Sequence, residues 1–287
     1  MATVEAEGYS ELEQEAYQET LDALREALQV RPPDEIVDWL NILVYGDPGV
    51  GKTWLAGTAA DDPRTSPVLY LDCEGGVTTI RHRRDIETVR VRSIPQLEEI
   101  YNKLYYAIDS RTGKIPYGTV IVDPITELAD LDMRTIMKET HAAKPETTDI
   151  DVPSPREWGK NRNHIRLIVR GLRDLPCHTI LIAHAGKDQD SSTPPIISYY
   201  PGFSGKLKVE ISGFMDVVGY YYPDTTTGVI VRKLQVTGTR RIQAKDRTDR
   251  LGGVIENPTI PMLWDMISDD PKTNTEANEN GNESLVD

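Results

Sequence analysis

Residues 42–53 read Ile-Leu-Val-Tyr-Gly-Asp-Pro-Gly-Val-Gly-Lys-Thr, and this stretch decides the expected fold. Its first four residues are typical of a buried strand, and a helical stretch begins at Lys52. Between them lies the pattern Gly-x4-Gly-Lys-Thr, which matches the phosphate-binding loop known as a P-loop. Its glycines allow backbone N–H groups to converge on phosphate oxygens, and a helix N-terminus adds a favourable partial charge. The strand, loop and helix together predict a nucleotide-phosphate site rather than an ordinary glycine-rich turn.

The residues of this loop have separate expected roles. Lys52 should contact the β- and γ-phosphates of ATP, and the hydroxyl of Thr53 should bind Mg²⁺. ATP and Mg²⁺ are therefore the predicted cofactors. The residues expected to bind the nucleotide are Gly46, Asp47, Pro48, Gly49, Val50, Gly51, Lys52, Thr53 and Trp54.

Two carboxylates follow later apolar runs. Asp123 ends the run Thr119-Val120-Ile121-Val122, as a Walker B aspartate does, and we expect it to hold the metal; the alternative is a helix N-cap. The next residue is Pro124, so the general base must come from elsewhere. Glu74 is the candidate base, because it follows a strand that we expect to lie beside the P-loop strand. The alternative for Glu74 is a solvated loop position.

Short apolar runs alternate with helical stretches along most of the chain. This alternation predicts an α/β fold with a mostly parallel central sheet and helices on both faces. Closely spaced runs beyond Ile211 predict antiparallel strands at the C-terminal side of the sheet. The expected strands are residues 42–45, 68–72, 88–91, 119–123, 179–183, 215–222, 229–236 and 239–244, and the expected helices begin near Lys52, Pro95, Ile125 and Trp158.

The charges divide the chain into three parts. The formal net charge is −14, but residues 1–38 hold 11 acidic and 2 basic side chains, and residues 269–287 hold 6 and 1. Residues 39–268 hold 29 of each sign and are neutral. We therefore predict an acidic N-terminal extension over 1–38 with an amphipathic helix from Tyr9 to about Gln29, a central domain over 39–268, and a disordered acidic tail over 269–287. A neutral body can carry a local basic surface, whereas a uniformly acidic one would repel nucleic acid.

Cysteine and apolar content indicate the compartment. The two cysteines, Cys73 and Cys177, do not form a disulfide framework, and the acidic N-terminus has no apolar segment behind it. No apolar run is long enough to span a bilayer. We expect a soluble, cytoplasmic protein without a membrane partner.

Three short motifs after the P-loop resemble the RecA-type ATPase core. They are Leu71-Asp72-Cys73-Glu74, Val120-Ile121-Val122-Asp123 and Leu181-Ile182-Ala183-His184, in that order. The resemblance implies a RecA-like P-loop NTPase core in which Glu74 is catalytic and His184 ends a strand as the sensor of the γ-phosphate. Without the resemblance, His184 is equally well read as a satisfied strand-end residue.

A fourth motif, Gln243-Ala244-Lys245-Asp246-Arg247, is similar to the Lys-x-Arg of DnaB-type helicases. This resemblance implies that Lys245 and Arg247 reach the ATP of a neighbouring subunit, within a homo-oligomeric ring or filament. The alternative is an exposed charged turn. The chain as a whole is most similar to a compact phage-encoded group of RecA-like ATPases associated with single-strand annealing and recombination, which implies the cytoplasm of a host cell.

Two loops and one helix are candidates for contact with single-stranded DNA. In RecA-like proteins such loops approach DNA, and here they correspond to residues 139–156 and 186–205. The second loop supplies aromatic and basic side chains suited to bases and phosphates, and the helix near Trp158 has a basic face. Core packing of the loop and a solvated or subunit-facing helix are the alternatives. The side chains concerned are Tyr199, Tyr200, Phe203, Lys187, Lys206, Lys208, Arg162, Arg166, Arg170 and Arg173.

These observations predict an oligomeric ATPase that acts on single-stranded DNA in recombination, annealing or repair, with a single-strand-binding or other recombination protein as a further partner. One alternative is a DnaB-class helicase-like motor. Another is an ATP-dependent switch between proteins, without DNA activity. A small-molecule kinase is disfavoured because no acceptor site or lid is recognisable.

Overall fold

The computed structural model describes residues 11–28, 30, 39–226 and 228–268. The chain divides into two units, residues 1–38 and 39–287. In the first unit, α1 (Glu11–Ala27) is the helix expected between Tyr9 and Gln29, and its side chains Tyr17 and Leu24 are exposed. The tail predicted over 269–287 lies outside the described residues.

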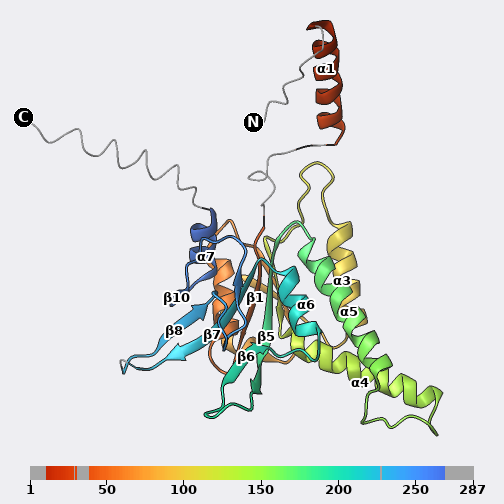
Figure 1. The fold of residues 1–287 in the computed structure, drawn as a ribbon, viewed down its shortest axis with the longest axis vertical. Coiled ribbons are helices and arrows are strands. Elements are labelled where there is room, and N and C mark those ends of the chain that lie inside the picture. Colours follow the sequence, from red (N-terminus) through yellow and green to blue (C-terminus); the bar gives the residue numbers. More distant parts are fainter. Residues whose placement is uncertain (1–10, 29, 31–38, 227, 269–287) are drawn as a thin grey trace, which may run out of the picture. The chain divides into compact units, whose positions relative to one another are not determined.

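The second unit is built on one mixed sheet with helices on both faces, which confirms the α/β prediction (Figure 1). Along the described residues the strand order is β10-β8-β7-β1-β5-β4-β2-β3, with β6 paired to β5 and β9 paired to β7. The strands are β1 (Asn41–Gly46), β2 (Val68–Asp72), β3 (Ile86–Arg90), β4 (Thr119–Asp123), β5 (His178–Gln189), β6 (Ile197–Pro201), β7 (Val217–Asp224), β8 (Val231–Gln235), β9 (Lys245–Asp246) and β10 (Val254–Glu256). The helices are α2 (Lys52–Gly57), α3 (Ile94–Tyr106), α4 (Ile125–Ala143), α5 (Pro155–Arg173), α6 (Leu207–Phe214) and α7 (Ile260–Ser268), with short 3₁₀ turns η2 (Thr58–Asp61) and η3 (Gly76–Ile80).

Successive side chains of each central strand enter different cores. In β1, Leu43 and Tyr45 join the core under α3 to α6, whereas Ile42 and Val44 join the core under α2 and α7. Strands buried on both faces read as continuous apolar runs, which is why these runs were recognisable from sequence. Burial of such strands fixes their register and therefore the positions of the loops at their ends.

The sheet differs from the prediction at its C-terminal side. β7, predicted as part of the antiparallel continuation, pairs parallel with β1, and the antiparallel pairing begins with β8. The strand expected over 239–244 is not formed in the described residues; Ile242 makes an isolated bridge with Tyr199, and the short β9 that follows pairs with β7. A run of apolar residues does not reveal the direction in which it will pair.

The segment 186–205, predicted to be a loop, is largely a β-hairpin. β5 continues to Gln189, and β6 returns antiparallel to it, with Ala185 opposite Pro201. The helix α5 also begins earlier than expected, at Pro155, because Ser154 and Glu157 form a capping box. None of the described helices combines the length and apolar character needed to cross a membrane.

Candidate active site at the carboxyl edge of the sheet

A cavity of about 470 Å³ lies where the parallel strands end, which we call the carboxyl edge. Open parallel sheets bind ligands at this edge. Three chain segments and two strand residues, His184 of β5 and Arg232 of β8, meet there. The lining residues are Pro48, Gly49, Gly51, Lys52, Thr53, Trp54, Glu74, Gly75, Gly76, Thr79, Asp123, Pro124, His184 and Arg232.

The P-loop follows β1 and curls around the ammonium group of Lys52. The Nζ atom donates to the carbonyl oxygens of Gly46 and Asp47, at 2.9 Å each, and the side chain is buried. Burial lowers the pKa of Lys52, and nearby carboxylates, Asp123 first, oppose that shift. A cation held in a curled glycine-rich loop at the start of a helix is suited to bind phosphate.

Thr53 and Asp123 are brought together across 70 residues of sequence. The Thr53 hydroxyl donates to Oδ2 of Asp123 at 2.6 Å, and the buried Tyr70 hydroxyl donates to the same oxygen at 2.6 Å. Burial raises the pKa of Asp123, and the two hydrogen bonds oppose that shift. The alternative of an N-cap is wrong, because the cap position of α4 is Pro124, without a side-chain cap.

This pair fits the ligands that Mg²⁺ prefers, which are hydroxyl and carboxylate oxygens supplemented by water and substrate phosphates. Within the described residues, no group of three or more His, Cys, Asp or Glu side chains could hold a metal ion by itself. A magnesium ion here would therefore depend on the nucleotide for part of its shell. When bound, it would neutralise charge on the phosphates.

Glu74 lines the cavity, although its strand is not where the sequence suggested. β2 does not lie beside β1, because β5 and β4 separate them in the sheet. Glu74 reaches the cavity from the loop after β2, and Asp72 holds that loop by accepting from the backbone of Gly75 at 2.7 Å and of Gly76 at 3.1 Å. Arg90 donates to the other oxygen of Asp72 at 2.7 Å, so the loop has a fixed base.

His184 lies beside Glu74, with Nε2 and Oε2 3.1 Å apart. The expectation that His184 ends its strand is wrong, because β5 continues into the hairpin; His184 pairs instead with Gly46 at the start of the P-loop. Its Nδ1 is buried and has no partner among the described residues. His184 thus links Glu74, through a side-chain contact, to the start of the P-loop, through strand pairing.

A family model, described as an AAA domain, matches residues 39–248, which is more than half of the chain. The chain belongs to this AAA domain family. It therefore carries an AAA-type P-loop ATPase domain, for which nucleotide binding is expected.

Comparisons with individual proteins are less informative about the chain than the match to the family model. No curated protein matches the chain. Among solved structures, this AAA domain is similar to a KaiC-like protein from the hyperthermophilic archaeon Pyrococcus horikoshii OT3, with 13% sequence identity, coverage of 80% of this chain and 96% of that chain, and a TM-score of 0.41.

Sequence reasoning missed Arg232, the remaining cation of the cavity. It lies on β8, and its Nε donates to the carbonyl oxygen of Val50 in the P-loop at 3.2 Å. The apolar run over 229–236 predicted a strand but gave no sign that the strand would begin beside the P-loop, 182 residues away.

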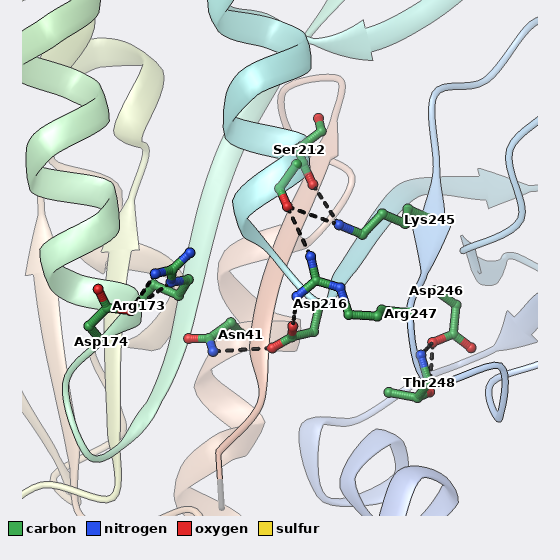
Figure 2. A network of polar contacts seen from close by, with 10 residues as sticks. Asn41, Arg173, Asp174, Ser212, Asp216, Lys245, Asp246, Arg247 and Thr248 are labelled. Carbon is green, nitrogen blue, oxygen red and sulfur yellow. Dashed lines mark hydrogen bonds and ion pairs between the residues drawn. The ribbon is translucent and has the colours of Figure 1, made fainter. Parts of the chain in front are cut away.

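Lys245 and Arg247 lie elsewhere in the AAA domain. β9 pairs with Val217 and Val218 at the start of β7, so these cations lie at the opposite, amino edge of the sheet. Lys245 donates to the carbonyl oxygen of Ser212 at 3.1 Å, and Arg247 pairs with Asp216 at 2.9 Å (Figure 2). Both therefore contact the C-terminal end of α6 or the turn after it within one chain, and their role at a neighbour's ATP stays a prediction.

The predicted DNA-binding side chains have mixed surroundings. Phe203 is buried in the core, so its predicted stacking on bases is wrong. Arg166 pairs with Glu210, and Arg170 lies over the ring of Phe214, so part of the basic face of α5 packs on α6. The hairpin keeps partly exposed tyrosines, Tyr199 and Tyr200, and Lys187 of the hairpin pairs with Asp47 of the P-loop at 3.0 Å.

Proposed function

We propose that this AAA domain hydrolyses ATP and couples hydrolysis to single-stranded DNA, as an oligomer acting in recombination, annealing or repair. The observation that carries hydrolysis is the position of Glu74, a carboxylate in the same cavity as Lys52 and the Thr53–Asp123 pair. A carboxylate there can accept the proton of a water that attacks the terminal phosphate.

The side chains of the cavity have separate roles in the proposed reaction. Lys52 binds phosphate charge, Thr53 and Asp123 hold the metal, and His184 orients Glu74 through their 3.1 Å contact. Because His184 lies on the strand that continues into the β5–β6 hairpin, a change at the terminal phosphate has a short covalent path to that hairpin.

The hairpin supports contact with DNA. Together with residues 238–244 it lines a second cavity of about 430 Å³, which includes Tyr199, Tyr200, Lys208, Arg240 and Arg241. Aromatic and basic side chains around one groove suit the stacked bases and phosphates of a single strand. Asp188 lies in the same groove and pairs with Lys208 at 3.1 Å, so binding requires that this ion pair be outcompeted by phosphate.

ATP turnover measured with and without single-stranded DNA, across a salt series, tests the proposal. We expect stimulation that declines as salt rises, because phosphate contacts release counterions. Arg241→Gln should reduce the stimulation and leave basal turnover unchanged, and the exposed Arg111→Gln, distant in sequence from the groove, is its matched control. Turnover that ignores DNA at every salt concentration would favour the protein switch, and duplex unwinding in a strand-displacement assay would favour the helicase-like motor.

Oligomerisation has its own test, because Lys245 and Arg247 are proposed to complete a neighbour's site. Glu74→Gln and Arg247→Ala should each be inactive alone. A mixed assembly contains interfaces with an intact Glu74 and an intact Arg247, and these should hydrolyse ATP. Co-assembly without recovered activity at any mixing ratio would contradict action between subunits.

A further inference from the structure

The strand β8 places a cation beside the P-loop for a topological reason. β7 runs parallel to β1, with Tyr45 opposite Tyr220, and β8 runs antiparallel to β7, with Arg232 opposite Pro223. Residue 232 therefore lies near the carboxyl edge, where β1 ends in the P-loop. Its neighbour in the chain, Lys233, is engaged differently and pairs with Asp224 at 2.8 Å and Glu256 at 3.1 Å.

The guanidinium of Arg232 is close to the loop but sparsely bonded. Its Nε donates to Val50, and a Cβ placed on Gly51 would lie 3.0 Å from that same Nε. Among the described residues, no carboxylate pairs with Arg232, and its two terminal nitrogens have no hydrogen-bond partner. An arginine offers five N–H donors in a planar fork, so most of its donors remain available to a ligand in the cavity.

The backbone at this position is held independently of the side chain. The Arg232 N–H donates to Oδ1 of Asn257 at 3.0 Å, and the Asn257 N–H donates back to the Arg232 carbonyl at 2.6 Å. Asn257 is in the left-handed region, at φ 44°, which asparagine tolerates better than most residues. Replacing the arginine side chain should therefore leave the strand in place.

We propose that Arg232 is a second phosphate-binding cation of the nucleotide site, supplied by the same chain as Lys52. The inference rests on the proposed function, since it concerns the same cavity. A nucleoside triphosphate brings several negative charges into a cavity that already holds Glu74 and Asp123, and Lys52 alone does not balance them. Guanidinium groups bind phosphate through paired, charge-assisted hydrogen bonds. The free donors of Arg232 can form such bonds and offset part of the negative charge of the nucleotide.

The rival explanation is structural: Arg232 braces the P-loop through Val50 and never touches the ligand. The two roles predict different results. If Arg232 only braces the P-loop, replacing it should lower the melting temperature of the nucleotide-free protein. If Arg232 contacts phosphate, replacing it should weaken the affinity for phosphate-bearing ligands, because one positive charge is lost from the site.

Calorimetric titration with Mg-ATP, and with Mg-tripolyphosphate as a ligand without base or ribose, tests the proposal. Arg232→Gln should weaken the binding of both ligands about tenfold, while the melting temperature of the nucleotide-free protein stays near that of the wild type. Lys233→Gln, which removes one positive charge from the same strand, is the matched control and should bind both ligands within about twofold of the wild type.

Three outcomes would overturn the proposal. One is an unchanged affinity for ATP in Arg232→Gln. Another is a loss confined to ATP, which would move the contact to the base or ribose. The last is an equal loss of affinity in Lys233→Gln, which would show that the effect comes from the net charge of the protein and not from a contact of Arg232. Failure of the proposed function looks different, because the wild type would then bind ATP without hydrolysing it, and the comparison of affinities would still be valid.

Discussion

The two edges of the central sheet use the same kinds of side chain in opposite ways. At the carboxyl edge, Lys52, Glu74 and Arg232 line a cavity. At the amino edge, Arg247 pairs with Asp216, whose other oxygen accepts from Asn41 at 3.1 Å, so these three side chains form one bonded network (Figure 2). Charged side chains alone therefore do not identify a ligand site, whereas charged side chains that line a cavity do.

The difference follows from the direction of the chain. After β1, β3 and β4 the chain passes through a loop or turn into a helix, whereas β5 and β7 continue into antiparallel strands, and these connections gather polar groups at the carboxyl edge. At the amino edge the buried His178, the first residue of β5, accepts from the backbone N–H of Leu40 at 2.9 Å. Such hydrogen bonds satisfy the polar groups at the amino edge and stabilise the sheet there.

The largest effect is expected from Lys52→Ala. It removes the buried ammonium group from the P-loop, and the affinity for ATP should fall by about 100-fold or more. Isothermal titration calorimetry measures this directly. Lys103→Ala, at an exposed position of α3, is the control and should bind ATP as the wild type does. If a folded Lys52→Ala protein bound ATP with wild-type affinity, the carboxyl edge would not be the nucleotide site.

Glu74→Gln should keep the affinity for ATP and lose hydrolysis by about 10²–10⁴-fold, because only the proton acceptor is neutralised. Phosphate release under single-turnover conditions, together with a binding titration, separates the two quantities. Glu98→Gln changes an exposed glutamate of α3 in the same way and should hydrolyse ATP normally. If Glu74→Gln also hydrolyses at the wild-type rate, the base is another group.

The amino edge should respond to acid through His178. Burial lowers the pKa of His178 to about 4, from an ordinary value of 6.5, between the rings of Trp39 and Trp264. The unfolded chain therefore takes up the proton first as pH falls, and the contribution to stability present above pH 6.5 is lost progressively toward pH 4. The free energy of unfolding should drop by about 2 kcal/mol from this group between pH 7 and pH 5.

Urea unfolding of the wild type and of His178→Gln at these two pH values isolates that contribution. The amide of glutamine can still accept from Leu40 but does not titrate, so the variant should lose less stability on acidification. Equal pH dependence in the two proteins would show that His178 is not the group responsible.

The smallest effect is expected from Asp216→Asn. It removes the ion pair with Arg247, a partly exposed pair, so the free energy of unfolding should fall by at most about 1 kcal/mol. The affinity for ATP should not change, since Asp216 lies at the edge away from the cavity. A weakened affinity measured by calorimetry would show that the two edges are coupled.

The sequence predicted the central strands β1, β2 and β4 and the buried first half of β5 closely, because double burial leaves an apolar run with polar residues at its end. It predicted the hairpin β5–β6 as a loop, because most of its residues are exposed or only partly buried, so they form no continuous apolar run, and they include turn-forming residues such as Pro194. The capping box at Ser154 was a readable signal for the start of α5 that the apolar pattern alone did not give.

The sequence by itself determined the P-loop, the alternation of strands with helices, and the residues Lys52, Thr53 and Asp123. These depend on local rules: glycine positions, side-chain periodicity and the residue at the end of a strand. Only the tertiary structure decided that Glu74 meets His184 across 110 residues and that Arg232 meets Val50 across 182 residues. Strand order and pairing direction set these meetings, and they arise from packing between distant segments, which no local pattern encodes.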